Sequence, residues 1–128
     1  MSINSICMGI AGALALSMAA DAHHSYSMFD NSKEVEINGV VTQFDWSNPH
    51  IWIRLLVSDG KAGTTAEWII EGPSTNGMAR RGWTKRSLKV ADKADLFIYV
   101  LKSGKPGGFV IRGSANGKPI GTGSLEPT

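Results

Sequence analysis

Residues 35–57 read VEINGVVTQFDWSNPHIWIRLLV, and this stretch decides the fold. Apolar side chains occupy odd positions first, as at Ile37 and Val41, and even positions afterwards, as at Phe44, with Val40 already out of phase. The buried face of the strand therefore changes near Gly39. A glycine at such a change predicts a β-bulge and a bent first strand.

The segment after this strand predicts a turn and then a series of short elements. Ser47-Asn48-Pro49 ends the first strand, because proline cannot donate to a β-ladder and asparagine suits a turn. Apolar alternation predicts strands over 51–57 and 66–71, followed by a short helix that Ser74 or Thr75 caps and Gly82 ends. Further strands are expected over 95–102, with apolar residues on both faces, and over 109–112. Asn116-Gly117 predicts a hairpin turn before 118–120.

This order of elements predicts a mainly β fold. Three strands, one short helix and two or three more strands suit a small five-stranded Greek-key barrel of the OB (oligonucleotide/oligosaccharide-binding) type, with the helix between strands 3 and 4. A plain β-sandwich is the alternative. Neither fold selects a function by itself, so the function has to be argued from particular side chains.

The first 22 residues differ in composition from the rest of the chain. They contain no Lys or Arg, and the apolar run 6–18 leads into Ala20-Asp21-Ala22, a pattern that signal peptidase recognises. The run is shorter than the roughly 20 residues that cross a membrane, although a buried helix or a short anchor is the alternative. We expect residues 1–22 to be a cleaved secretory signal peptide and the protein to be periplasmic or secreted, with no membrane span after cleavage.

Cleavage would leave one domain over 23–128, with an N-terminal arm over 23–33 and a loose tail over 121–128. This mature chain has a formal charge of +3, which is too small to indicate a nucleic-acid-binding protein. The single cysteine, Cys7, falls in the signal peptide, so the domain can form neither a disulfide nor a thiolate metal site.

The three histidines form two clusters that predict a metal site. Cleavage after Ala22 would make His23 the N-terminus, where its amine and imidazole can chelate one ion, and His24 adds a second imidazole. An imidazole from His50 would complete a nitrogen-rich set. Such ligands favour copper, because Cu(II) prefers nitrogen donors in a plane, with zinc as the alternative. The opposing interpretation is a free terminus and a hydrogen-bonded turn histidine.

These clusters also carry a resemblance to a known family. The His23-His24-Ser25 start, Phe29-Asp30, the Trp46-Ser47-Asn48-Pro49-His50 turn and Arg81-Gly82-Trp83 resemble an uncharacterised family of small exported bacterial proteins. The resemblance covers nearly the whole mature chain. It implies export and the domain boundaries, but no activity.

Aromatic and basic residues suggest weaker candidate surfaces. Trp46, Asn48 and Trp52 flank or belong to the His50 turn and could contact a small ligand or another periplasmic protein. Arg81 and Trp83 lie in a basic segment that could bind an anion. The alternative for Trp83 is a position capping the barrel, because large aromatic residues usually supply the core of so small a domain.

The sequence therefore favours a binding protein over an enzyme. No cysteine remains after cleavage and no Gly-x-Ser-x-Gly elbow is present, so no catalytic residues are predicted. The leading hypothesis is an exported carrier, sensor or accessory protein that binds copper through His23, His24 and His50. The alternatives are a metal-free module that uses the Trp46–Trp52 surface and a copper enzyme of redox type.

Overall fold

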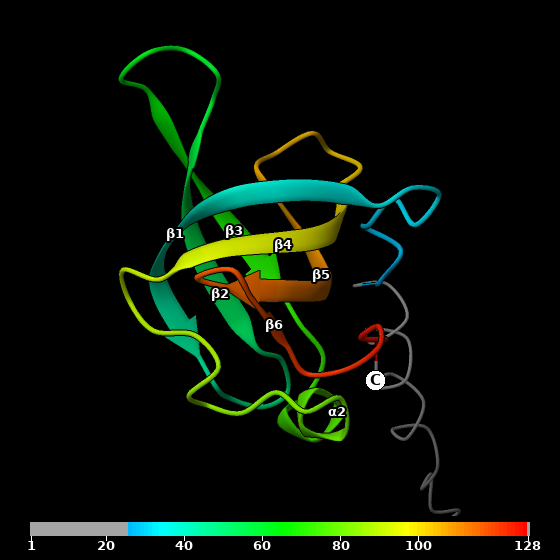
Figure 1. Ribbon diagram of the computed structural model, residues 1–128. Coiled ribbons are helices and arrows are strands. Elements are labelled where there is room, and N and C mark those ends of the chain that lie inside the picture. The colour runs from blue at the N-terminus through cyan, green and yellow to red at the C-terminus, as the bar shows by residue number, and fades with distance from the viewer. Residues whose placement is uncertain (1–25, 128) are drawn as a thin grey trace, which may run out of the picture.

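A pairing between the third and fifth strands closes the sheet of this protein into a barrel (Figure 1). The computed structural model describes residues 26–127. The elements are β1 (Val35–Asp45), β2 (Trp52–Ser58), β3 (Thr65–Glu71), α2 (Thr75–Arg80), β4 (Lys93–Val100), β5 (Gly107–Ala115) and β6 (Lys118–Ile120).

The strand order is β3-β2-β1-β4-β5-β6, and β3 also pairs with β5. All neighbours are antiparallel except β3 and β5, which run parallel through Ile69–Glu71 and Gly107–Phe109. Five strands thus form the closed barrel, and β6 is added beyond β5. This confirms the predicted OB-type barrel with one short helix between strands 3 and 4.

The first strand is long and bent because it serves two neighbours. Its first half pairs with β4, and its second half pairs with β2. A Cβ atom on Gly39 would lie 2.7 Å from the carbonyl oxygen of Leu56, so a side chain has no room there. The irregularity itself lies between Val41 and Gln43, and Val40 is exposed. The predicted bulge is confirmed, but it lies slightly later than Gly39.

Helix α2 covers one end of the barrel (Figure 1). The Ser74 hydroxyl accepts a hydrogen bond from the backbone N–H of Gly77 at 3.2 Å, which makes Ser74 the predicted N-cap. Gly82 follows the helix with φ of +84°, a conformation that glycine adopts without strain. The helix directs Met78 into the core.

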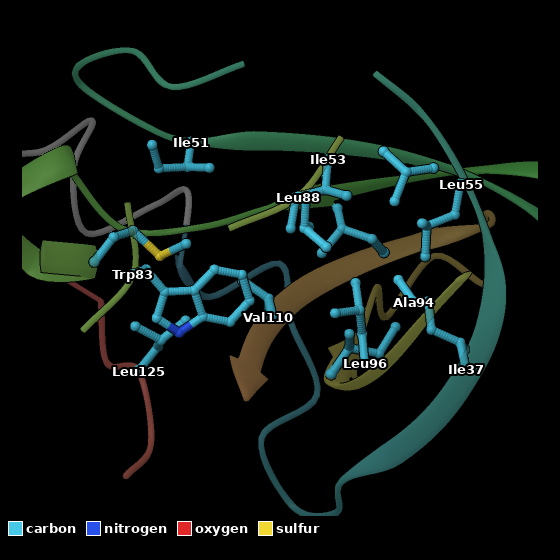
Figure 2. Close-up of a cluster of buried hydrophobic side chains, with 14 residues drawn as sticks. Ile37, Ile51, Ile53, Leu55, Trp83, Leu88, Ala94, Leu96, Val110 and Leu125 are labelled. Atoms are coloured by element: carbon cyan, nitrogen blue, oxygen red, sulfur yellow. The ribbon is translucent and has the colours of Figure 1, made fainter. Parts of the chain in front are cut away.

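The barrel interior is filled by aliphatic side chains from every strand of the barrel and by one tryptophan (Figure 2). Trp83 follows α2 and is 1% exposed, beside Leu125 and Val110 (Figure 2). Gly121 lies against its ring, where a side chain would collide with the backbone of Arg81 and press on the indole, and a side chain at the nearby Gly113 would collide with Leu96. The buried cluster consists of Ile37, Val41, Ile51, Ile53, Leu55, Ile70, Met78, Trp83, Leu88, Ala94, Leu96, Ile98, Val110 and Leu125.

Strand β4 lies between β1 and β5, as its two apolar faces predicted. On the outer face, the guanidinium of Arg112 stacks 4.0 Å from the centre of the Phe97 ring. The same Arg112 forms an ion pair with Glu34 at 2.5 Å. The Arg112 side chain therefore covers part of the apolar outer face of β4.

The segment after β6, where the sequence predicted a loose tail, is held to the barrel at two points. Leu125 is buried and donates its backbone N–H to the carbonyl of Ile111 at 2.6 Å. Thr122 likewise donates to the carbonyl of Arg81 at 2.7 Å. Leu125 is the single apolar residue of this glycine-rich segment, and it fills the space beside Trp83. One apolar residue produces no periodic pattern, so the sequence could not reveal this contact.

Within residues 26–127, no helix is long and apolar enough to span a membrane.

Candidate functional site

A cavity of about 460 Å³ lies beside His50. We call it the His50 cavity. It is bounded by the turn between β1 and β2, the end of β3, the start of α2, one residue of β5 and the segment just before Asp30. Its walls are made by Tyr26, Phe29, Asn48, Pro49, His50, Glu71, Ser74, Asn76, Phe109 and Pro127.

Backbone hydrogen bonds hold the His50 turn against the end of β3. Ile51 donates its N–H to the carbonyl of Pro73 at 3.0 Å, and Gly72 donates to the carbonyl of Ile51 at 2.7 Å. The Asn48–Pro49 peptide is cis. The two backbone hydrogen bonds fix the turn next to Glu71, which lies opposite Trp52 in the β2–β3 register.

The imidazole of His50 is oriented by two oxygen atoms. Its Nδ1 lies 3.3 Å from the carbonyl oxygen of Gly72 and 3.3 Å from Oε1 of Glu71. A carbonyl oxygen can only accept, so this contact places the hydrogen on Nδ1. In the neutral imidazole, the other ring nitrogen, Nε2, then carries the free lone pair.

Glu71 is the one buried charged residue among those described. Burial raises the pKa of Glu71 above its usual value of 4.5, and the nearby His50 acts in the opposite direction. The raised pKa means that the charged form of the Glu71 carboxyl group is destabilised by its burial. A positive charge next to Glu71 would relieve this cost.

Replacing Glu71 with glutamine is expected to stabilise the metal-free protein at neutral pH. Because the pKa of Glu71 is raised in the folded state, its contribution to stability is present below pH 4.5 and is lost as the pH rises through the folded-state pKa. The melting temperatures of the two proteins should therefore converge in acid and separate at neutral pH. Thermal unfolding followed by circular dichroism across this range tests the expectation.

Glu67→Gln is the matched control for this prediction. Glu67 lies on the same strand and pairs with the exposed Arg54 at 2.6 Å. Removing its charge should cost at most about 1 kcal/mol, because exposed ion pairs contribute little. A Glu71→Gln protein that melts below the unmodified protein at neutral pH would contradict the expected sign.

An aromatic wall attaches the N-terminal arm to this cavity. Tyr26, Phe29 and Phe109 pack together, with ring centroids 5.7–6.3 Å apart. Phe29 also forms a β-bridge with Leu101, and Lys102 donates its N–H to the carbonyl of Met28 at 2.9 Å. The arm is therefore anchored from Tyr26 onward.

The comparisons with known proteins identify the family of this chain. A model of the family of unknown function DUF6152 matches residues 12–110. The chain belongs to this family. No curated protein and no solved structure matches it. The DUF6152 match confirms the resemblance to an uncharacterised family, whereas its motifs and export stay predictions.

The structure of this DUF6152 protein places only one of the predicted metal ligands. His50 lies half-buried at its cavity, while His23 and His24 lie outside the described residues. No group of three or more His, Cys, Asp or Glu within 26–127 could hold a metal ion. The described part of the chain thus supplies one imidazole and its carboxylate partner.

The residues of the predicted contact surfaces of the DUF6152 protein do not all lie at the surface. Trp52 is 37% exposed on the outer face of β2, whereas Trp46 packs against the core and lies edge-on to Phe44. Arg81 is exposed after α2, but Trp83 is a core side chain and cannot form part of a surface. The interpretation of Trp83 as a cap of the barrel is the correct one.

The partners of His50 carry little signal in the sequence. Glu71 stood among several acidic residues with no distinctive spacing, and the Gly72 carbonyl has no sequence signature. Tyr26, Phe29 and Phe109 are distant in sequence from the His50 turn. Only the position of Glu71, immediately before Gly72-Pro73 at the end of a strand, could have indicated a side chain close to a turn.

Replacing Asn48 with alanine is expected to loosen the His50 turn. The Asn48 Oδ1 accepts hydrogen bonds from the N–H and the hydroxyl of Thr75, both at 3.0 Å, and so ties the turn to α2. We expect a loss of about 1 kcal/mol in the free energy of unfolding. Urea unfolding measures it, and the NMR signals of the His50 ring should broaden or shift.

Asn76→Ala provides the control, since Asn76 lines the same cavity from α2. An equal loss of stability in Asn48→Ala and Asn76→Ala would show that the hydrogen bonds from Thr75 to Asn48 do not stabilise the turn.

Proposed function

We propose that this protein is an exported metal-binding protein, with copper as the preferred ion, that acts as a carrier, sensor or accessory protein. The ligands are His50 together with His23 and His24 at the mature N-terminus. The observation that carries the proposal is the pair of contacts at His50 Nδ1, to Glu71 and Gly72, which leaves Nε2 free.

This arrangement of His50 is typical of metal-binding histidines. Such residues commonly donate the second ring N–H to a carboxylate or a backbone carbonyl, which fixes the tautomer and makes the ligating nitrogen more basic. Glu71 and Gly72 supply both kinds of acceptor. The bound cation would also offset the burial cost of the Glu71 carboxylate.

The length of the chain supports a site shared with the N-terminal histidines. Tyr26 lines the His50 cavity, and in the sequence His24 and His23 precede it by two and three residues, lengths of chain that span at most about 7 and 11 Å. The length of this connection is compatible with a site that His23 and His24 share with His50.

The donor set favours copper. A terminal amine, backbone amide nitrogen and imidazoles suit tetragonal Cu(II), and no thiolate is available in the mature chain to select another ion. Zinc is the chemical competitor, because tetrahedral imidazole sites bind it well. The barrel has its own hydrophobic core, so the ion would be cargo or signal rather than a requirement for folding.

The experiment begins with the intact mass of the protein recovered from the periplasm or medium, which locates the mature N-terminus. Titration with Cu(II), followed by electron paramagnetic resonance, then reports the number of nitrogen ligands. We expect a chain that begins at His23 and one tight, nitrogen-rich site. A chain with this start and no tight Cu(II) or Zn(II) site would refute the proposal.

A further inference from the structure

A second cavity, of about 370 Å³, lies on the outer face of β2 and β3. We call it the Trp52 groove. It adjoins the His50 cavity, because Phe29 and Glu71 line both. The residues that matter for the argument are Met28, Trp52, Ile69, Leu101, Lys105 and Pro106.

The groove gathers exposed apolar side chains. Met28, Trp52 and Ile69 are three of the large hydrophobic residues that the described part of the chain leaves exposed, and all three line this groove. Trp52 and Ile69 share a face because Trp52 pairs with Glu71 and Arg54 pairs with Ile69 in the β2–β3 register. Clustered apolar exposure of this kind marks a binding site.

The charges around the groove leave one cation without a partner. The Glu67 carboxylate is paired with Arg54 at 2.6 Å, and the Glu71 carboxylate lies 3.3 Å from His50 Nδ1 on the side of the His50 cavity. Lys105, on the loop between β4 and β5, has no ion pair within residues 26–127. An anion with an apolar body would complement both the lining and this ammonium.

The position of the groove agrees with a ligand site. Five-stranded OB-type barrels bind oligonucleotides and oligosaccharides on the face of strands 2 and 3, between the loops that follow strands 1 and 4. The Trp52 groove lies on that face, with the 4–5 loop as one wall. Its volume and mostly apolar lining with few polar groups are typical of small-molecule sites.

We propose that the Trp52 groove binds a small aromatic carboxylate. The ring packs between the Trp52 indole and the Ile69 side chain, with the Met28 thioether at its edge, and the carboxylate pairs with Lys105. This inference does not depend on metal binding at His50.

The test uses 2-naphthoate as the probe and the metal-free protein, with binding measured by calorimetry and by changes in amide NMR signals. We expect saturable binding, with shifts at Ile69 and Lys105. Ile69→Ser should weaken binding about tenfold, because it removes one of the two apolar side chains that hold the ring. Lys105→Gln should weaken it about threefold, and Lys105→Arg should restore it.

Leu56→Ser is the matched control. Leu56 is 40% exposed, close to the 39% of Ile69, and lies on β2 outside the groove. Its replacement should change affinity less than about twofold. The neutral amide 2-naphthamide should bind more weakly than 2-naphthoate. The proposal fails if 2-naphthoate does not saturate, if Ile69→Ser and Leu56→Ser behave alike, or if the amide binds as tightly as the acid.

Discussion

Replacement of His50 by alanine is expected to lower the affinity for Cu(II) by about 100-fold or more, since even the loss of a hydrogen-bonded partner of a ligand costs about 10- to 100-fold. The reason is the geometry at His50, where Glu71 and Gly72 hold Nδ1 and leave Nε2 for the ion. Glu71→Gln should give an intermediate loss of about tenfold, because the amide oxygen still accepts from Nδ1 but carries no charge. Competition titration against a chelator of known affinity measures both.

Asn76→Ala serves again as the control, because Asn76 lines the His50 cavity without contacting His50 in any hydrogen bond of the described chain. Its Cu(II) affinity should match that of the unmodified protein. If His50→Ala retains full affinity and the same spectrum, the ion is held by the N-terminus alone. The protein would then be a generic terminal chelator, and the shared site would be wrong.

Replacement of Trp83 by alanine is expected to cost about 3–5 kcal/mol in the free energy of unfolding. Trp83 is 1% exposed and is the largest fully buried side chain in the described chain. It fills the end of the barrel between α2 and the anchored tail, where Leu125 packs (Figure 2). Because small domains are stabilised by only about 5–15 kcal/mol, this loss removes a large part of the free energy of unfolding.

Trp52→Ala is the matched control for Trp83. Trp52 is 37% exposed on the outer face, so its removal should cost about 1 kcal/mol. Urea unfolding followed by circular dichroism gives both values, and Trp83→Leu should fall between them. If the two variants lost equal free energy of unfolding, burial of Trp83 at the end of the barrel would not be a major source of stability.

Local patterns predicted most of the fold because each element carries its own signal. The β1 bend is visible in the change of apolar parity, the helix in Ser74 and Gly82, and the last hairpin in Asn116-Gly117, where both residues have positive φ. The bulge was placed too early because Gly39 and Val40 both lie at the change of phase. Gly39 is needed for another reason, the close approach of β2.

The candidate site was only partly predictable because it is made of distant pieces. His50 stood out within a distinctive turn, but its contact with Glu71 depends on the register of β2 with β3, which no local pattern specifies. The Trp52 groove likewise needs Lys105, from a loop about 50 residues later in the sequence, to complete its wall. Trp52 was the one residue of that groove that the sequence singled out as a candidate contact residue.

The parallel seam between β3 and β5 couples the order of folding to the formation of the site. Glu71 pairs with Phe109 there, and Phe109 also closes the aromatic wall of the His50 cavity. Such long-range parallel contacts form late, because the intervening chain must first be ordered. A chain truncated before residue 107 would therefore contain every proposed metal ligand and its carboxylate partner, yet it would lack Phe109, which completes the aromatic wall of the His50 cavity. The cavity around His50 is thus completed only when the barrel closes.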